Sequence, residues 1–73
     1  MRYRLLRPLL ALSGAADRMQ IVLLSDGAIL NIETDPKSCS PNRLIPAVYD
    51  SEVVNVFAVD LIEWSERVNA AYD

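Results

Sequence analysis

Residues 43–63, RLIPAVYDSEVVNVFAVDLIE, are the part of this 73-residue sequence that decides its fold class. Two apolar runs, 43–49 and 52–59, flank Asp50-Ser51, and β-branched runs of this kind around a two-residue polar turn predict a β-hairpin. The second run is apolar on both faces: Val53, Phe57 and Val59 on one, and Val54, Val56 and Ala58 on the other. Such a strand is either covered on both sides or carries an interface.

Upstream, the apolar runs 20–25 and 28–34 flank Asp26-Gly27. An Asp-Gly pair favours a type I′ turn, in which both central residues have positive φ, so the segment predicts a second hairpin. Residues 28–34, AILNIET, alternate between apolar and polar side chains, which is typical of a half-buried strand.

Prolines mark irregular places in two further strands. Pro8 interrupts the apolar segment 2–12, which therefore predicts an edge strand or a strand with an irregular middle. Pro46 predicts that 43–49 is an edge strand or contains a bulge. Residues 13–19 are mostly small or polar and predict a loop or a wide hairpin connection.

The tail DLIEWSERVNAAYD, residues 60–73, is compatible with two structures. In the first, Asp60 and Glu63 form a capping box, and a helix places four residues on one face: Leu61, Trp64, Val68 and Tyr72. In the second, a 3-10 turn at 60–62 precedes a last strand with three inward residues: Ile62, Trp64 and Val68. We favour the turn followed by a strand.

Five short strands with close turns predict a small closed or half-closed barrel, since closure removes exposed sheet edges. Residues 21–33, IVLLSDGAILNIE, resemble the second-strand region of SH3-like barrels, and 43–63 resemble their next hairpin and short 3-10 turn. The chain is also similar to short uncharacterised bacterial proteins with an R-Y-R-L start and a V-F-A-V-D-L ending, here 2–5 and 56–61.

The chain length predicts one domain over residues 1–73. The order of strands and this resemblance, which covers about residues 2–62, predict an all-β fold, a small SH3-like barrel of about five antiparallel strands with a 3-10 turn or short helix near the C-terminus. The alternative is a small α+β domain with a helix over 60–72 packed on an antiparallel sheet. Peptide-binding SH3 domains carry an A-L-Y-D-Y opening and paired tryptophans, whereas this chain has Ala11-Leu12-Ser13 and a single tryptophan. Polyproline recognition is therefore not predicted.

The residue inventory argues against catalysis. There is no histidine, and Cys39 is the only cysteine, so neither an internal disulfide nor a cysteine-histidine zinc site can form. Gly14 and Gly27 are the only glycines, which leaves no phosphate-binding loop. Cys39 lies near Lys37 in a polar loop and is interpreted as an ordinary loop cysteine. We expect a protein that is not an enzyme and uses no metal or cofactor.

Size and composition point to a protein partner. A chain this short buries only about 60% of its unfolded surface, and small domains often gain support from oligomerisation. The hydrophobic fraction is 52%, so apolar surface should remain outside the core. We expect a protein-interaction module that forms a homo-oligomer or binds a protein partner, and the candidate interface residues are Val54, Val56, Ala58 and Trp64.

Two other functions remain open. A nucleic-acid-binding barrel would use the basic N-terminal part of the chain, that is Arg2, Arg4, Arg7 and Arg18, although the net charge of −3 argues against it. A small-ligand or ion sensor would use the loop 34–42, because binding residues often lie on loops.

The first residues, MRYRLLRPLLALSGAA, combine a basic head with leucines, as secretory signals do. Arg7 and Pro8 cut the apolar run, which a signal needs over about 7–15 residues, so we expect a cytoplasmic protein. No stretch approaches the 18 or so apolar residues of a membrane helix.

Overall fold

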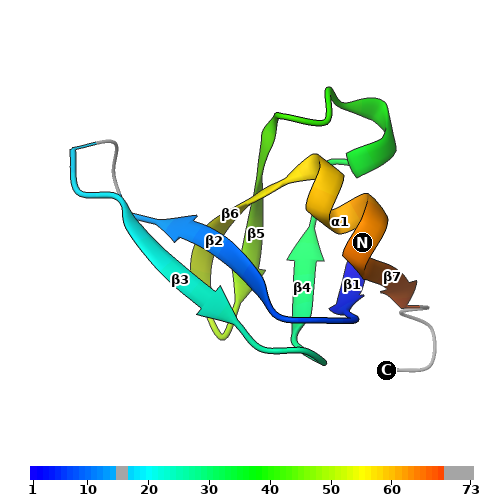
Figure 1. The fold of residues 1–73 in the computed structure, drawn as a ribbon, viewed down its shortest axis with the longest axis horizontal. Coiled ribbons are helices and arrows are strands. Elements are labelled where there is room, and N and C mark those ends of the chain that lie inside the picture. Colours follow the sequence, from blue (N-terminus) through cyan, green and yellow to red (C-terminus); the bar gives the residue numbers. More distant parts are fainter. Residues whose placement is uncertain (15–16, 69–73) are drawn as a thin grey trace.

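The computed structural model describes residues 1–14 and 17–68. These residues form seven β-strands, one 3-10 turn and one short α-helix (Figure 1). In chain order the elements are β1 (Arg2–Leu5), β2 (Leu9–Ser13), β3 (Gln20–Leu24), β4 (Ile29–Ile32), η1 (Pro36–Ser38), β5 (Leu44–Tyr49), β6 (Glu52–Phe57), α1 (Ala58–Trp64) and β7 (Ser65–Val68). The chain is thus mostly antiparallel β-structure, with more strands than the five expected.

All seven strands belong to one sheet in the order β3-β2-β6-β5-β4-β1-β7. β1 and β2 are four places apart in this order, which is about 19 Å in a flat sheet. Only residues 6–8 join them, and that link spans at most about 14 Å. The sheet must therefore curve strongly. Within the described residues no ladder joins the outer strands β3 and β7, so the sheet is open.

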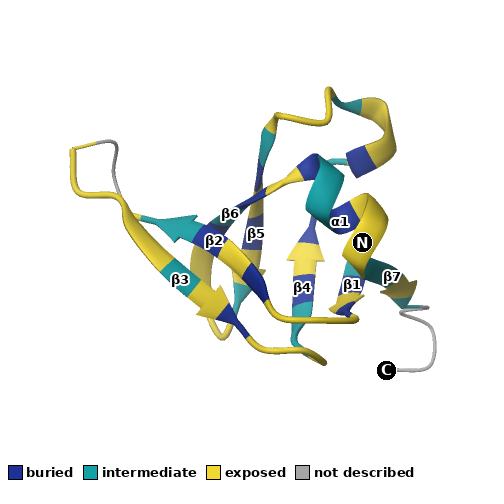
Figure 2. Cartoon of the chain, viewed as in Figure 1, coloured by how far each residue is buried: buried dark blue, intermediate teal, exposed yellow. Residues whose placement is uncertain are grey.

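The concave side of this curved sheet contains the core (Figure 2). Its buried residues are all hydrophobic: Tyr3, Leu5, Leu9, Ala11, Leu24, Leu30, Ile32, Ile45, Ala47, Val54, Val56, Ala58 and Leu61. Helix α1 contributes Ala58 and Leu61, and Pro36 of η1 is also buried. The short helix and the 3-10 turn thus cover the part of the core that the strands leave open.

The hairpin predicted around Asp50-Ser51 is confirmed. β5 and β6 pair along their whole length, from Leu44 opposite Phe57 to Tyr49 opposite Glu52. Asp50 and Ser51 have φ values of 52° and 66°. Positive φ at both central residues is the property of a type I′ turn, so this turn forms here without any glycine.

The hairpin predicted around Asp26-Gly27 is wrong. The two residues do form a turn, in which the Ala28 N–H donates to the Ser25 carbonyl oxygen at 3.2 Å. Only Gly27 has positive φ, at 82°, and the flanking strands are not neighbours. β3 pairs with β2, whereas β4 pairs with β1 and β5. The turn therefore passes the chain between two distant parts of the sheet.

Pro8 lies between two strands, and Pro46 lies where its strand has a paired neighbour on one side only. Segment 2–12 has the irregular middle expected of it, since residues 6–8 separate β1 from β2. Pro46 does not mark an edge strand, because β5 lies between β6 and β4. The β4–β5 ladder ends at Ile32 opposite Ala47, so Pro46 has a paired neighbour only on β6, namely Asn55. Because no residue of β4 pairs with Pro46, the absence of an N–H on proline is tolerated inside the sheet.

Of the two structures expected near the C-terminus, a 3-10 turn or a short helix, the structure has the short helix, and the strand expected after it is confirmed. An α-helix replaces the expected 3-10 turn and begins at Ala58, so Phe57 and not Asp60 occupies its N-cap position. β7 follows and pairs with β1, which also excludes a helix running through 60–72. Leu61 faces the core, whereas Ile62 and Trp64, expected to point inward, are 44% and 37% exposed. Tyr72 lies outside the described residues.

Candidate functional site

The structure places three of the four predicted interface residues in the core. Val54, Val56 and Ala58 are 2%, 0% and 0% exposed. Val54 lies opposite Ala47 and Val56 opposite Ile45, and these partners are buried too. This side of β6 therefore faces the core, and the prediction that it forms an interface is wrong. The exposed side of β6 is the opposite one.

The opposite side of β6 belongs to a continuous apolar surface over four strands. We call it the outer apolar face and define it by the outward positions of β3, β2, β6 and β5, which are Ile21, Leu23, Leu10, Leu12, Val53, Asn55, Phe57, Leu44, Pro46 and Val48. Six of these are large hydrophobic residues with exposed fractions between 40% and 71%, namely Leu10, Ile21, Leu23, Val48, Val53 and Phe57. Asn55 is the only polar member, and none is charged.

The pairing register explains why these side chains share one side. Directly opposed residues of an antiparallel pair point to the same side of the sheet. Leu12 lies opposite both Ile21 of β3 and Asn55 of β6, and Asn55 in turn lies opposite Pro46 of β5. One row of the face therefore crosses all four strands with Asn55 in its interior.

Asn55 is hydrogen-bonded within the face. Its side-chain Nδ2 donates to the Leu12 carbonyl oxygen at 3.3 Å and so connects β6 to β2. The asparagine that interrupts the most apolar strand thus helps hold the β2–β3 hairpin against the rest of the sheet.

Strand β3 forms one edge of this face. It pairs with β2 and has no other neighbour among the described strands. Its sequence QIVLL contains no charge and no proline, the two features that commonly protect sheet edges. Ile21 and Leu23 are 71% and 66% exposed. Figure 2 shows the β2–β3 hairpin with exposed bands along both strands, extending away from α1 and β7.

Trp64, the fourth predicted interface residue, lies elsewhere. It ends α1, and its ring contacts Arg7, whose guanidinium carbon is 4.2 Å from the ring centroid. Trp64 remains 37% exposed, but this contact occupies part of its ring. It is therefore not a member of the outer apolar face.

The four arginines of the nucleic-acid alternative are not gathered on one surface. Arg2 and Arg4 lie on the outward side of β1, and Arg4 pairs with Glu66 of β7 through its Nε at 2.9 Å and its Nη2. Arg7 contacts Trp64, and Arg18 lies in the loop between β2 and β3. At least two of the four therefore have other partners.

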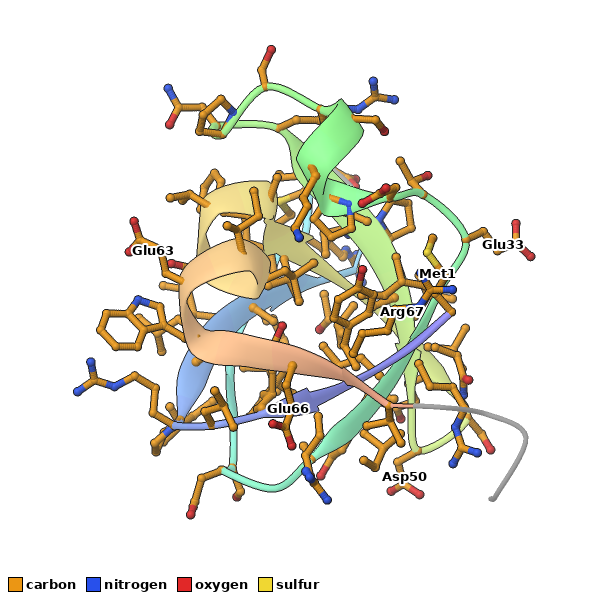
Figure 3. The ribbon with its side chains drawn as sticks, turned by 90° about the vertical axis from the view of Figure 1, so that its right-hand side faces the viewer. Met1, Glu33, Asp50, Glu63, Glu66 and Arg67 are labelled. Carbon is orange, nitrogen blue, oxygen red and sulfur yellow. The ribbon has the colours of Figure 1, made fainter. Side chains whose placement is uncertain are left out.

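The loop 34–42 borders a cavity of about 330 Å³ between η1, α1 and β7. Its lining includes charges of both signs, among them Asp35, Lys37 and Arg67. Figure 3 shows Glu66 and Arg67 extending from opposite sides of β7. Asp35 is engaged within the loop, since its Oδ1 accepts the Lys37 N–H at 3.0 Å. Half-buried Cys39 directs its Sγ to the Asp35 carbonyl oxygen at 3.6 Å.

Neither a metal site nor a membrane helix is found in the described part of the chain. Over residues 1–14 and 17–68, no three His, Cys, Asp or Glu side chains come together as ligands for a metal ion. Over the same residues, no helix has the length and apolar character needed to cross a membrane.

Sequence reasoning missed most of the outer apolar face. The run 20–25 is apolar at consecutive positions, so it carries no alternation that would distinguish the inward from the outward residues. The pairing of the β2–β3 hairpin with β6, in which Leu12 lies opposite Asn55, settles that question, and it joins residues 43 positions apart in the chain. The comparisons with known proteins add no further assignment: no family model, curated protein or solved structure matches this chain.

Proposed function

We propose that this chain is a non-catalytic protein-interaction module whose binding surface is the outer apolar face. The observation that carries the proposal is the exposure of six large hydrophobic side chains on one uncharged face. Extended apolar patches on monomers commonly mark interaction sites, and the centres of protein interfaces are depleted in charge. A charge-free face also avoids the cost of burying unpaired ions on binding.

The strength of this surface can be estimated from burial. Fully burying one Val, Leu, Ile or Phe side chain contributes about 1.5–3 kcal/mol, so six that are about half exposed contribute roughly 5–9 kcal/mol. Association costs about 4–15 kcal/mol in lost freedom. A partner must therefore cover most of the face to bind stably, and contact with one or two of its residues is not enough.

We further propose that the curved sheet is a small SH3-like barrel. Three features support this: the short link between β1 and β2, the strong curvature that it imposes, and the helical segment before the last strand. The outer apolar face would then be one wall of the barrel. A cytoplasmic location is part of the same proposal, supported by the presence of a lone cysteine, which forms no internal disulfide.

The nucleic-acid alternative has less support, because Arg4 pairs with Glu66 and Arg7 contacts Trp64. The sensor alternative has one specific observation in its favour, the cavity beside loop 34–42. Its lining mixes Asp35 and Glu66 with Lys37 and Arg67, so it does not select a ligand of one charge.

The proposal is tested by placing a charge on the face. Leu23→Glu changes a residue that is 66% exposed on the outer apolar face, and Ile62→Glu is a control, since Ile62 is also exposed but lies on α1. Circular dichroism first establishes that both variants are folded. Light scattering then gives the mass, and the dye Nile red reports exposed apolar surface.

The wild-type protein should either associate or bind the dye as a monomer, and Leu23→Glu should remove that property while Ile62→Glu keeps it. A wild-type property that responds equally to both substitutions, or to neither, would show that the binding surface lies elsewhere.

A further inference from the structure

Two copies of the outer apolar face can approach each other without electrostatic cost at the contact. The chain has a net charge of −3, so copies repel one another at long range. None of the ten residues that define the face is charged. The face is therefore a part of this acidic molecule that two copies can bring together without opposing carboxylates.

Asn55 gives the face a self-complementary polar centre. Its Nδ2 has two hydrogens, and the hydrogen bond to the Leu12 carbonyl oxygen uses one of them. A purely apolar partner would leave the second hydrogen and the side-chain oxygen buried without partners, which is costly. A second Asn55 related by a two-fold axis supplies the matching acceptor and donor.

A dimer of ordinary size needs a modest share of the whole surface of the chain. A standard interface takes about 800 Å² from each partner. The chain exposes 4985 Å² in total, so such an interface needs about one sixth of its surface. Four of the seven strands contribute to the outer apolar face, with Asn55 in the interior of one row.

We infer that the partner of the outer apolar face is a second copy of this chain, packed face to face about a two-fold axis that passes close to Asn55. This inference rests on the proposed function, since it names the partner for the same surface. The dimer is isologous: each face is both the donor and the acceptor of the same contacts.

The first experiment is sedimentation equilibrium of the whole chain over a wide concentration range, with Nile red binding measured in parallel. The wild type and Ile62→Glu should reach twice the chain mass of 8.1 kDa, and Leu23→Glu should remain at the chain mass. The dimer is overturned if the wild type stays monomeric at its solubility limit.

The dye separates the two possible failures. If the wild type is a monomer and only Leu23→Glu loses dye binding, the face remains a binding surface for a different protein, and only the dimer is excluded. If the wild type is a monomer and dye binding is the same in Leu23→Glu and Ile62→Glu, the proposed function is excluded as well. If the dimer persists in Leu23→Glu, it uses another surface, and both the face-to-face dimer and the proposed function are excluded.

The second experiment tests the position of the axis. Asn55→Asp places two carboxylates next to each other across the axis, and Asn42→Asp is the matched control, because Asn42 is exposed in a loop outside the face. Asn55→Asp should raise the dimer dissociation constant about 100-fold or more at neutral pH.

Acidification below about pH 4 protonates the new carboxylates and should restore the Asn55→Asp dimer. Because a protonated carboxyl can also donate to the Leu12 carbonyl oxygen, as Asn55 does, circular dichroism at both pH values must first show that the variant is folded. Asn42→Asp should dimerise as the wild type does at both pH values. An Asn55→Asp variant that is folded and dimerises with unchanged affinity at neutral pH would overturn the placement of the axis.

Discussion

The guanidinium carbon of Arg7 lies 4.2 Å from the centroid of the Trp64 ring. The neighbouring Leu6 N–H donates to the Trp64 carbonyl oxygen at 2.8 Å. Together these contacts connect the bend between β1 and β2 to the last residue of α1. That bend directs the chain from one part of the curved sheet to another, so the contacts stabilise the curvature on which the outer apolar face depends.

Arg7→Ala should lower the free energy of unfolding by about 0.5–1 kcal/mol, because a partly exposed cation–π contact is lost. Urea unfolding followed by the fluorescence of Trp64, the only tryptophan, measures this change. Arg18→Ala is the control, since Arg18 is exposed in the β2–β3 loop and should change stability by less than about 0.5 kcal/mol. Equal effects of the two substitutions would show that the contact with Trp64 does not stabilise the fold.

Gly14→Ala should be more destabilising than Gly27→Ala. Both glycines have positive φ, at 96° and 82°, and alanine there costs about 1–2 kcal/mol. A Cβ at position 14 would also lie 2.6 Å from the Arg18 backbone oxygen, whereas one at position 27 meets nothing within 4 Å. The additional clash should cost at least about 1 kcal/mol, measured by urea unfolding. Equal losses would mean that the backbone near residue 18 moves away freely.

The features that the sequence predicted correctly are local. The β5–β6 hairpin needs only two neighbouring apolar runs and a turn that holds Asp50-Ser51 at positive φ. The irregular middle of segment 2–12 follows from Pro8, whose ring and missing N–H act on its own neighbourhood. These predictions succeed because the residues that decide the structure are adjacent in the chain.

The features that the sequence missed depend on long-range pairing. Asp26-Gly27 carries the stronger hairpin signal, yet β3 and β4 pair with other strands. The two apolar sides of β6 look alike in sequence, and only the pairing of Val54 and Val56 with buried residues of β5 decides which side is inner. The sequence therefore predicted that an exposed apolar surface exists, but its residues could not be assigned until the pairing register was known.

Ser51→Gly should stabilise the protein by about 0.5–1 kcal/mol. Ser51 has a φ of 66°, a left-handed conformation that costs an ordinary residue about 1–2 kcal/mol, and glycine adopts it without that strain. The greater flexibility of glycine in the unfolded chain offsets part of the gain. Ser25→Gly is the control, because Ser25 is exposed beside a turn but has no positive φ, so it should destabilise slightly. If both substitutions destabilise, the type I′ turn is not strained at Ser51.

Leu61→Ala and Ile62→Ala test how α1 packs, since these adjacent residues are 0% and 44% exposed. Removing the buried Leu61 side chain leaves a cavity and should cost about 2–5 kcal/mol. A domain of this size has only about 3–5 kcal/mol of net stability, so Leu61→Ala should be largely unfolded by circular dichroism at 25 °C unless association with a partner supports it. Ile62→Ala should keep a cooperative thermal transition with a loss below about 1 kcal/mol. If Ile62→Ala were the more damaging substitution, α1 would present its other side to the core, with Ile62 inward as the turn-and-strand interpretation of the sequence had it.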